Sequence, residues 1–244
     1  MTKYRRSTID RLGVSVITCT KRPHFINNLI RNFTSQRHAK KELILVVHHD
    51  RVPLSYYLER TAGLRNVRIS RMPAFFSLGD CLNEAVRMAR YDIVAKFDDD
   101  DYYAPDYLTD SLLTLRRSKA DIVGKRTHYM YLQGSKKLIL RFPNGQHREA
   151  VRLPGATLMF KRKVFEQVRF PSRNVGEDDL FCIRSKRKGY KVYSGGKYNF
   201  AAVRRKHASD HTWTISDREL IAKHRVIRGV QDYKKYVRRK PEGL

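Results

Sequence analysis

The sequence predicts an α/β fold in which helices flank a mostly parallel, Rossmann-like sheet. Two observations support this prediction. Short β-branched segments alternate with amphipathic helical segments through residues 13–97, an order that is typical of parallel sheets. Residues 42–50 (ELILVVHHD) also begin with an unbroken apolar run, as expected of a strand that is buried on both faces.

The first half of the chain supplies most of this sheet. Strands are expected at residues 13–20, 42–50, 66–70 and 92–97. Pro23 suits the first turn of a helix, because its ring fixes φ near the helical value. Apolar residues then recur at helical spacing, and they are Phe25, Ile26, Leu29, Ile30 and Phe33. A second helical stripe comprises Leu78, Cys81, Leu82, Ala85 and Met88.

The second half predicts a more mixed set of elements. We expect a helix after Pro105, a strand at 121–124, a hairpin at 128–140, a strand leading into a helix at 154–168 and a helix that begins near Gly176. The sequence thus divides into an N-terminal extension (1–12), two halves of one domain (13–104 and 105–214) and a basic helical tail (215–244).

Composition limits the class of protein. Of the 244 residues, 41% are hydrophobic, which is typical of a globular chain and not of a disordered one. No apolar run approaches the roughly 18 residues that a membrane span requires, so we expect a cytoplasmic protein. Cys19, Cys81 and Cys182 lie far apart without metal-ligand spacing and are expected to be reduced.

The chain is strongly basic. Lys and Arg number 51 against 24 acidic residues, and the segment 184–206 carries nine basic residues and no acid. Such a surface attracts a polyanion: a nucleic acid, an anionic membrane on which the protein is peripheral, or an acidic polymer or nucleotide substrate. The alternative is a solvated face that only keeps the protein soluble.

Against this basic background, four consecutive aspartates, Asp98 to Asp101, follow the strand at 92–97. Carboxylates at a strand end suit a hard cation, because Mg²⁺ and Mn²⁺ prefer oxygen ligands. Alternate residues of an extended chain point the same way, so Asp98 and Asp100 are expected to share a face, with Asp99 turned away. Alternatively, Asp100 and Asp101 cap the helix that follows Pro105.

The expected strand ends bring several polar segments together. Residues 18–20, 48–50 and 98–101 all lie at the carboxyl ends of strands, where ligands of parallel sheets bind. The spacing G-x-G-x-x-G and the P-loop spacing are absent from the sequence, which argues against an ordinary dinucleotide fold and a P-loop enzyme.

Five blocks in order make the sequence from Gly13 to about Trp213 resemble the family 2 glycosyltransferases, which have the GT-A fold. The blocks are VSVITCTKRP, ELILVVHHD, LNEAVRMARYDIVAKFDDDDYYAPDYL (with its D-x-D pattern), PGATLMFKRKVFEQV and GEDDLFCIRSKRKGYKVY. The resemblance implies inverting, metal-assisted transfer of a sugar from a UDP- or dTDP-linked donor. The acceptor would be a hydroxyl of a carbohydrate or of an anionic glycoconjugate, and the cofactor Mn²⁺ or Mg²⁺.

The resemblance also implies roles for individual residues. Asp178 would be the general base, with Glu177 and Asp179 as competitors, and Asp100 would bind the metal. His211 would be a further metal ligand or a diphosphate contact, or else a structural histidine. The nucleotide-sugar side would comprise Thr18, Thr20, Arg22, Asn83, Asp98, Asp99 and Asp100, with His49 or Asp50 at the base. The acceptor side would comprise Gly155, Glu177 and Trp213.

Two other classes of function remain open from the sequence. Basic residues mixed with tyrosines in the segment 184–206 suit a nucleic-acid-binding protein, in which the aspartates would serve nuclease or nucleotidyltransferase chemistry. No recognised nucleic-acid motif accompanies them, so nucleic acid is the less favoured partner. A carbohydrate-binding module without activity is the third interpretation.

Overall fold

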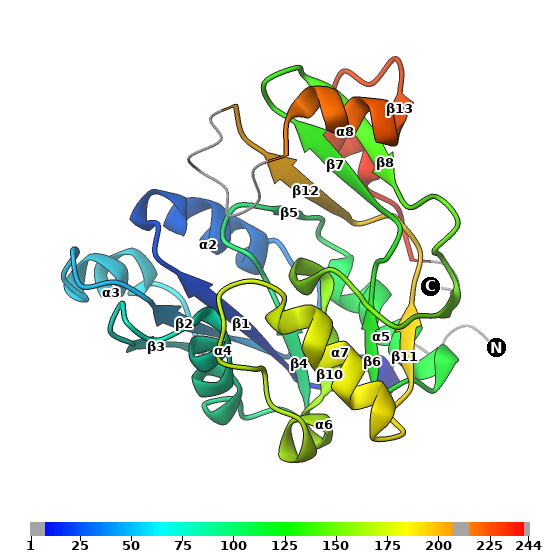
Figure 1. Ribbon diagram of the computed structural model, residues 1–244. Helices are drawn as coiled ribbons and strands as arrows, with labels where there is room; N and C mark the ends of the chain where they lie inside the picture. Colours follow the sequence, from blue (N-terminus) through cyan, green and yellow to red (C-terminus); the bar gives the residue numbers. More distant parts are fainter. Residues whose placement is uncertain (1–7, 207–214, 242–244) are drawn as a thin grey trace.

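The computed structural model describes residues 8–206 and 215–241, and the strands of this part form two sheets (Figure 1). The larger sheet has the strand order β3-β2-β1-β4-β10-β6-β11-β9. Its members are β1 (Val14–Thr20), β2 (Lys41–Val47), β3 (Val67–Arg71), β4 (Ile93–Lys96), β6 (Ile122–Gly124), β9 (Arg148–Glu149), β10 (Met159–Lys161) and β11 (Val192–Ser194). The four strands expected in the first half are therefore confirmed.

The central strand β1 lies between β2 and β4 and is parallel to both. Its side chains are almost all buried, because helices cover the sheet on either side. The strand β10 is antiparallel to both β4 and β6, so the sheet is mostly and not wholly parallel. The carboxyl ends of β1, β2 and β4 thus meet at one edge.

Helices pack on both faces of this sheet (Figure 1). They are α2 (Ile26–Thr34), α3 (Ser55–Thr61), α4 (Leu78–Arg87), α5 (Tyr107–Ser118), α6 (Arg162–Gln167) and α7 (Glu177–Arg187), with short 3₁₀ turns η1 (Pro23–Phe25) and η2 (Gly155–Thr157). The apolar stripes of α2 and α5 join one core cluster, whereas α4, α6 and α7 join the other. The helix α3 is an addition to the expected elements.

The smaller sheet has the order β13-β8-β7-β12-β5. Its strands are β5 (Tyr102–Tyr103), β7 (His128–Leu132), β8 (Lys137–Arg141), β12 (Phe200–Arg204) and β13 (Arg225–Ile227). The antiparallel pair β7–β8 is the expected hairpin. Because β5 follows the four aspartates directly, the aspartate turn joins the two sheets.

The tail is helical only in part. It contains α8 (Asp217–Lys223) and α9 (Tyr233–Val237), but β13 lies between them and pairs antiparallel with β8. The sequence RVI of β13 contains two β-branched residues, which favour a strand. Pairing with β8 satisfies the backbone N–H and C=O groups that the expected helix would have paired within itself. The tail is therefore an integral part of the smaller sheet.

Candidate active site

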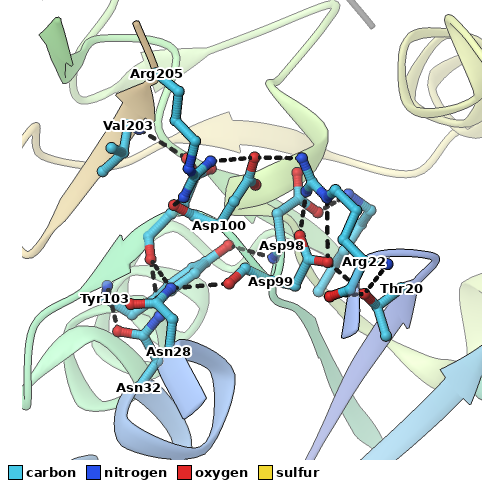
Figure 2. Close-up of polar contacts among 12 residues, drawn as sticks. Thr20, Arg22, Asn28, Asn32, Asp98, Asp99, Asp100, Tyr103, Val203 and Arg205 are labelled. Carbon is cyan, nitrogen blue, oxygen red and sulfur yellow. Dashed lines mark hydrogen bonds and ion pairs between the residues drawn. The ribbon is translucent and has the colours of Figure 1, made fainter. Parts of the chain in front are cut away.

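The four aspartates form the turn between β4 and β5, and arginines hold two of them. Asp99 is buried and accepts hydrogen bonds from the Thr20 hydroxyl and the Arg22 guanidinium. Asp100 Oδ2 lies 2.8 Å from Arg22 Nη1 and 3.0 Å from Arg205 Nη1 (Figure 2). Arg22 therefore bridges neighbouring carboxylates, which corrects the expectation that Asp99 and Asp100 point to opposite sides.

The helix α2 fixes the backbone of this turn. The amide Nδ2 of Asn28 donates to the carbonyls of Asp99 at 2.8 Å and Asp101 at 2.9 Å, and Asn32 Nδ2 donates to the Asp101 carbonyl at 2.8 Å. The backbone N–H of Asp98 donates to the Tyr103 hydroxyl at 2.8 Å. These contacts hold four like charges at one strand end (Figure 2).

The capping alternative for Asp101 is wrong. Asp101 is buried, and its Oδ1 accepts from the backbone N–H of Val203 in β12 at 2.8 Å. Burial, and next the charge of Asp100, raise the pKa of Asp101. The residue before α5 is Asp106, whose side chain makes no capping hydrogen bond. Asp101 thus connects the turn to the smaller sheet.

A buried lysine joins the aspartate turn to the helix α7. Lys96, the last residue of β4, is 5% exposed and forms an ion pair with Asp98. Burial alone would lower the pKa of Lys96, but the negative charges of Asp98, Glu177 and Asp178 raise it. The two acidic blocks of the sequence therefore surround one cation at the carboxyl edge of the sheet.

The three acids that begin α7 have three different environments. Asp178 Oδ2 accepts from the Gly155 N–H at 2.6 Å, and its Oδ1 accepts from the Asp179 N–H at 2.8 Å. Glu177 is 5% exposed, and burial raises its pKa to about 7. Asp179 Oδ2 lies 3.6 Å from Arg152 Nη1 near the surface. Asp178 is thus a partly exposed carboxylate with a fixed orientation.

The residues expected on the nucleotide side are not all accessible to a ligand. Thr18 is fully buried, and its hydroxyl has no hydrogen-bond partner among the described residues. His49 is buried, with Nε2 2.7 Å from the Tyr57 hydroxyl and Nδ1 accepting from the Arg51 N–H at 3.2 Å. Burial lowers the pKa of His49. Asp50 is exposed at the end of β2, so of the two candidates it is the accessible one.

Asn83 lies in α4 and contacts the segment that follows α6. Its Nδ2 donates to the Phe170 carbonyl at 2.9 Å and its Oδ1 accepts from the Phe170 N–H at 3.0 Å. Both polar ends of the amide therefore hold the segment after α6 against α4. This arrangement gives Asn83 a structural task in place of the expected nucleotide contact.

The expected metal ligands are only partly described. His211, a candidate metal ligand, lies outside the described residues, as does Trp213, which was expected on the acceptor side. Within the part of the chain that is described, no group of three or more His, Cys, Asp or Glu side chains is placed to hold a metal ion. Asp100 contributes carboxylate oxygen, the ligand type that Mg²⁺ and Mn²⁺ prefer, and these ions commonly bind one or two carboxylates together with substrate phosphates.

Several residues of the site were not identified from the sequence: Asn28, Asn32, Lys96, Tyr103 and Arg205. Lys96 had a detectable signal, because a lysine within the apolar strand segment DIVAKF is an unusual residue to bury. Arg205 had no such signal in the sequence, since its ion pair with Asp100 spans 105 residues.

The basic segment 184–206 is not one continuous charged face. Arg204 is buried with Nε 3.4 Å from Asp217, and Arg205 pairs with Asp100. Lys186 and Lys191 both lie within 4 Å of Glu149, at 3.9 and 3.8 Å. Among the described helices, none is long and apolar enough to cross a membrane.

Solved structures share this fold. The S. aureus protein TarS, residues 1–349 in complex with UDP-GlcNAc, is 18% identical with a TM-score of 0.64, over 84% of this chain and 62% of that one. A mannosyltransferase from Pyrobaculum calidifontis in complex with GDP-Man and Mn²⁺ is 17% identical with a TM-score of 0.60, over 82% and 62%. This chain thus spans about three fifths of either structure, and the likeness confirms the GT-A type of α/β fold.

No curated protein matches the sequence. The profile of Glycosyl transferase family 2 matches residues 15–176, which is more than half of the chain. The match includes the aspartate turn and Gly155 and ends immediately before the acids of α7. The chain therefore belongs to Glycosyl transferase family 2.

Proposed function

We propose that the protein transfers a sugar from a nucleotide-diphosphate donor, UDP- or dTDP-linked, to an acceptor hydroxyl with inversion. One observation carries the proposal: the aspartate turn and the start of α7, far apart in sequence, both lie around the buried cation Lys96. A donor-binding turn and a base are needed side by side for such a reaction. Family membership favours this function over nuclease or nucleotidyltransferase chemistry.

Asp178 is the proposed general base. The acceptor oxygen attacks the anomeric carbon while its proton passes to an oxygen of the Asp178 carboxylate. The bond from the anomeric carbon to the diphosphate oxygen breaks, and its electron pair leaves with the diphosphate. Each carboxylate oxygen of Asp178 has two acceptor positions, so the hydrogen bonds from Gly155 and Asp179 leave capacity for the acceptor hydroxyl.

The donor side is formed by Asp98, Asp100, Arg22 and Asp50. Asp98 is the most exposed of the first three aspartates, with 35% of its side chain accessible, and so is available to a ribose hydroxyl. Asp100 would hold Mn²⁺ or Mg²⁺, which when bound neutralises charge on the departing diphosphate. Arg22 and Arg205 already bring positive charge to this position.

A weaker proposal concerns the basic surface. The exposed cations Arg184, Arg187 and Lys188 at the end of α7 suit peripheral association with an anionic membrane or polymer. Binding to vesicles that contain anionic lipid should then fall steeply with salt. Binding that is independent of salt would contradict this association.

Donor binding provides the first test of the function. The full chain is heated with UDP-GlcNAc, dTDP-glucose, GDP-mannose or single-stranded DNA, with and without Mn²⁺. We expect a higher melting temperature with one of the nucleotide sugars, and a larger shift with Mn²⁺, because a ligand that binds only the folded state stabilises it. Stabilisation by DNA and by none of the sugars would overturn the proposal and favour the nucleic-acid alternative.

A further inference from the structure

A pocket with a volume of about 530 Å³ lies beside the start of α7, where its wall residue Arg152 contacts Asp179. Its wall is formed by Arg126 and by the segment 142–152, which connects β8 towards η2. Three arginines line it, Arg126, Arg148 and Arg152, against a single acid, Glu149. Lys186 and Lys191 flank Glu149 within 4 Å, at 3.9 and 3.8 Å. The pocket therefore carries a clear excess of positive charge.

One of these arginines is held in place before any ligand arrives. The guanidinium carbon of Arg126 lies 3.8 Å from the centroid of the Phe142 ring. Gly145 packs against the stem of Arg126, since a Cβ at Gly145 would lie 2.7 Å from Arg126 Cγ. The backbone N–H of Arg126 donates to the Ser194 hydroxyl at 3.0 Å, which holds the main chain from which the side chain extends. A guanidinium fixed in this way loses little conformational freedom when it binds an oxyanion with two parallel hydrogen bonds.

A second guanidinium shares the same aromatic ring. Arg141 lies 4.9 Å from the Phe142 centroid, and burial, together with the charge of Arg126, lowers its pKa to about 10. Like charges this close repel each other. An anion bound at Arg126 would reduce that repulsion.

The wall of the pocket lies close along the chain to the residue that contacts the proposed base. Arg152 in its wall lies 3.6 Å from Asp179, and Gly155, three residues further along, donates to Asp178. Three residues of chain span at most about 10 Å. A substrate with one hydroxyl at Asp178 can therefore extend into the pocket with a neighbouring group.

We propose that the pocket lined by Arg126, Arg148 and Arg152 binds an anionic group, a carboxylate or a phosphate, of the acceptor. The acceptor is accordingly an acidic sugar or glycoconjugate, and a neutral sugar binds more weakly because it brings no negative charge to the excess of arginines. This inference rests on the proposed function, because it assigns the pocket to the acceptor of that reaction.

The test measures binding of defined sugars to the full chain by NMR titration. Glucose 6-phosphate supplies a phosphate, glucuronate a carboxylate, and glucose is the neutral reference. We expect at least one charged sugar to bind about tenfold or more tightly than glucose, since hydrogen bonds to charged groups are the stronger class. Whichever charged sugar binds more tightly identifies the anionic group.

Substitutions test whether the charged sugar binds in this pocket. Arg126→Gln should weaken binding of the charged sugar about tenfold and leave binding of glucose unchanged. Arg148→Gln is a second variant, and its exposed side chain gives it little influence on folding. Arg65→Gln, in the exposed turn before β3, is the matched control and should bind like the wild type.

UDP affinity, measured on each variant, separates the two proposals. Wild-type protein that binds UDP but does not distinguish charged from neutral sugars would overturn the pocket assignment alone. The assignment also fails if Arg126→Gln and Arg148→Gln both bind the charged sugar as the wild type does. Wild-type protein that binds neither UDP nor a nucleotide sugar would instead overturn the proposed function.

Discussion

Replacing Gly155 by alanine should displace the carboxylate of the proposed base, Asp178, without changing that residue itself. A Cβ at Gly155 would lie 2.7 Å from Asp178 Oδ2 and 3.0 Å from Asp178 Cβ. Such contacts are too close, so the carboxylate has to rotate away. The 2.6 Å hydrogen bond from the Gly155 N–H to Asp178 is then lost. We therefore expect a folded protein whose base is misdirected.

The magnitude follows from the lost contact. A hydrogen bond to a charged group contributes about 1.5–3 kcal/mol. If that energy orients Asp178 in the transition state, its loss lowers kcat about ten- to a hundredfold. The free energy of unfolding should fall by no more than about the same 1.5–3 kcal/mol. Donor affinity should stay unchanged, because the aspartate turn makes no contact with the Gly155 N–H.

The assay compares kcat for release of the nucleotide diphosphate with the donor Kd from calorimetry. Urea unfolding of each protein measures its stability. The matched control is Gly63→Ala, because a Cβ at Gly63 would meet no atom within 4 Å. A Gly155→Ala variant that keeps wild-type kcat while Gly63→Ala also does would refute the link between Gly155, Asp178 and catalysis.

Three further predictions test single carboxylates. Asp178→Asn should lower kcat about a hundred- to ten-thousandfold with donor Kd intact, whereas Asp179→Asn should be mild; the reverse order of rates would assign the base to Asp179. Asp100→Asn should weaken calorimetric binding of UDP in Mn²⁺ far more than binding of uridine, and equal losses would count against a metal role. Glu177→Gln should raise the free energy of unfolding above that of the wild type only at higher pH. The folded-state pKa of Glu177 is about 7 against an ordinary 4.5, so the wild type loses up to about 3 kcal/mol as pH rises through that window. Equal urea midpoints of the two proteins at pH 8 would contradict this.

Periodicity was sufficient to predict the first four strands of the larger sheet and most of its helices, whereas β9 and β11 were not expected. Strands β1, β2 and β4 are long or apolar enough to be recognised locally, and the acids at the start of α7 marked its N-terminus. The helix α3 was missed because its short sequence SYYLERT buries only Tyr57 and Thr61 and so lacks an apolar stripe. The strand β13 was missed because three residues in a basic tail have no period that distinguishes a strand from a helix.

The location of the site was predictable from the sequence, but the partners of its carboxylates were not. Strand ends in a parallel sheet meet at one edge whatever their side chains, so the convergence of the segments followed from topology alone. Which group meets each carboxylate depends on contacts such as Arg22 with Asp99, which spans 77 residues of sequence. The expectation that alternate aspartates point the same way assumed an extended strand, but β4 ends at Lys96 and the chain turns there.

The pairing also explains why a basic protein concentrates four acids at one point. Three cations and one backbone N–H hold the four carboxylates: Lys96 pairs with Asp98, Arg22 with both Asp99 and Asp100, Arg205 with Asp100, and the Val203 N–H of β12 donates to Asp101.

Burial divides the four carboxylates into two pairs. Asp99 and Asp101 are the more deeply buried pair, and burial raises the pKa of Asp99 to about 6 and that of Asp101 as well. The donors offset part of this desolvation, and the contacts connect β1, the turn and β12. Asp98 and Asp100 retain more access to solvent, with 35% and 13% of their side chains exposed. The alternation that failed as a rule of side-chain direction therefore holds for burial: the second and fourth aspartates connect the turn to β1 and β12, and the first and third are the pair that we propose for the ligand.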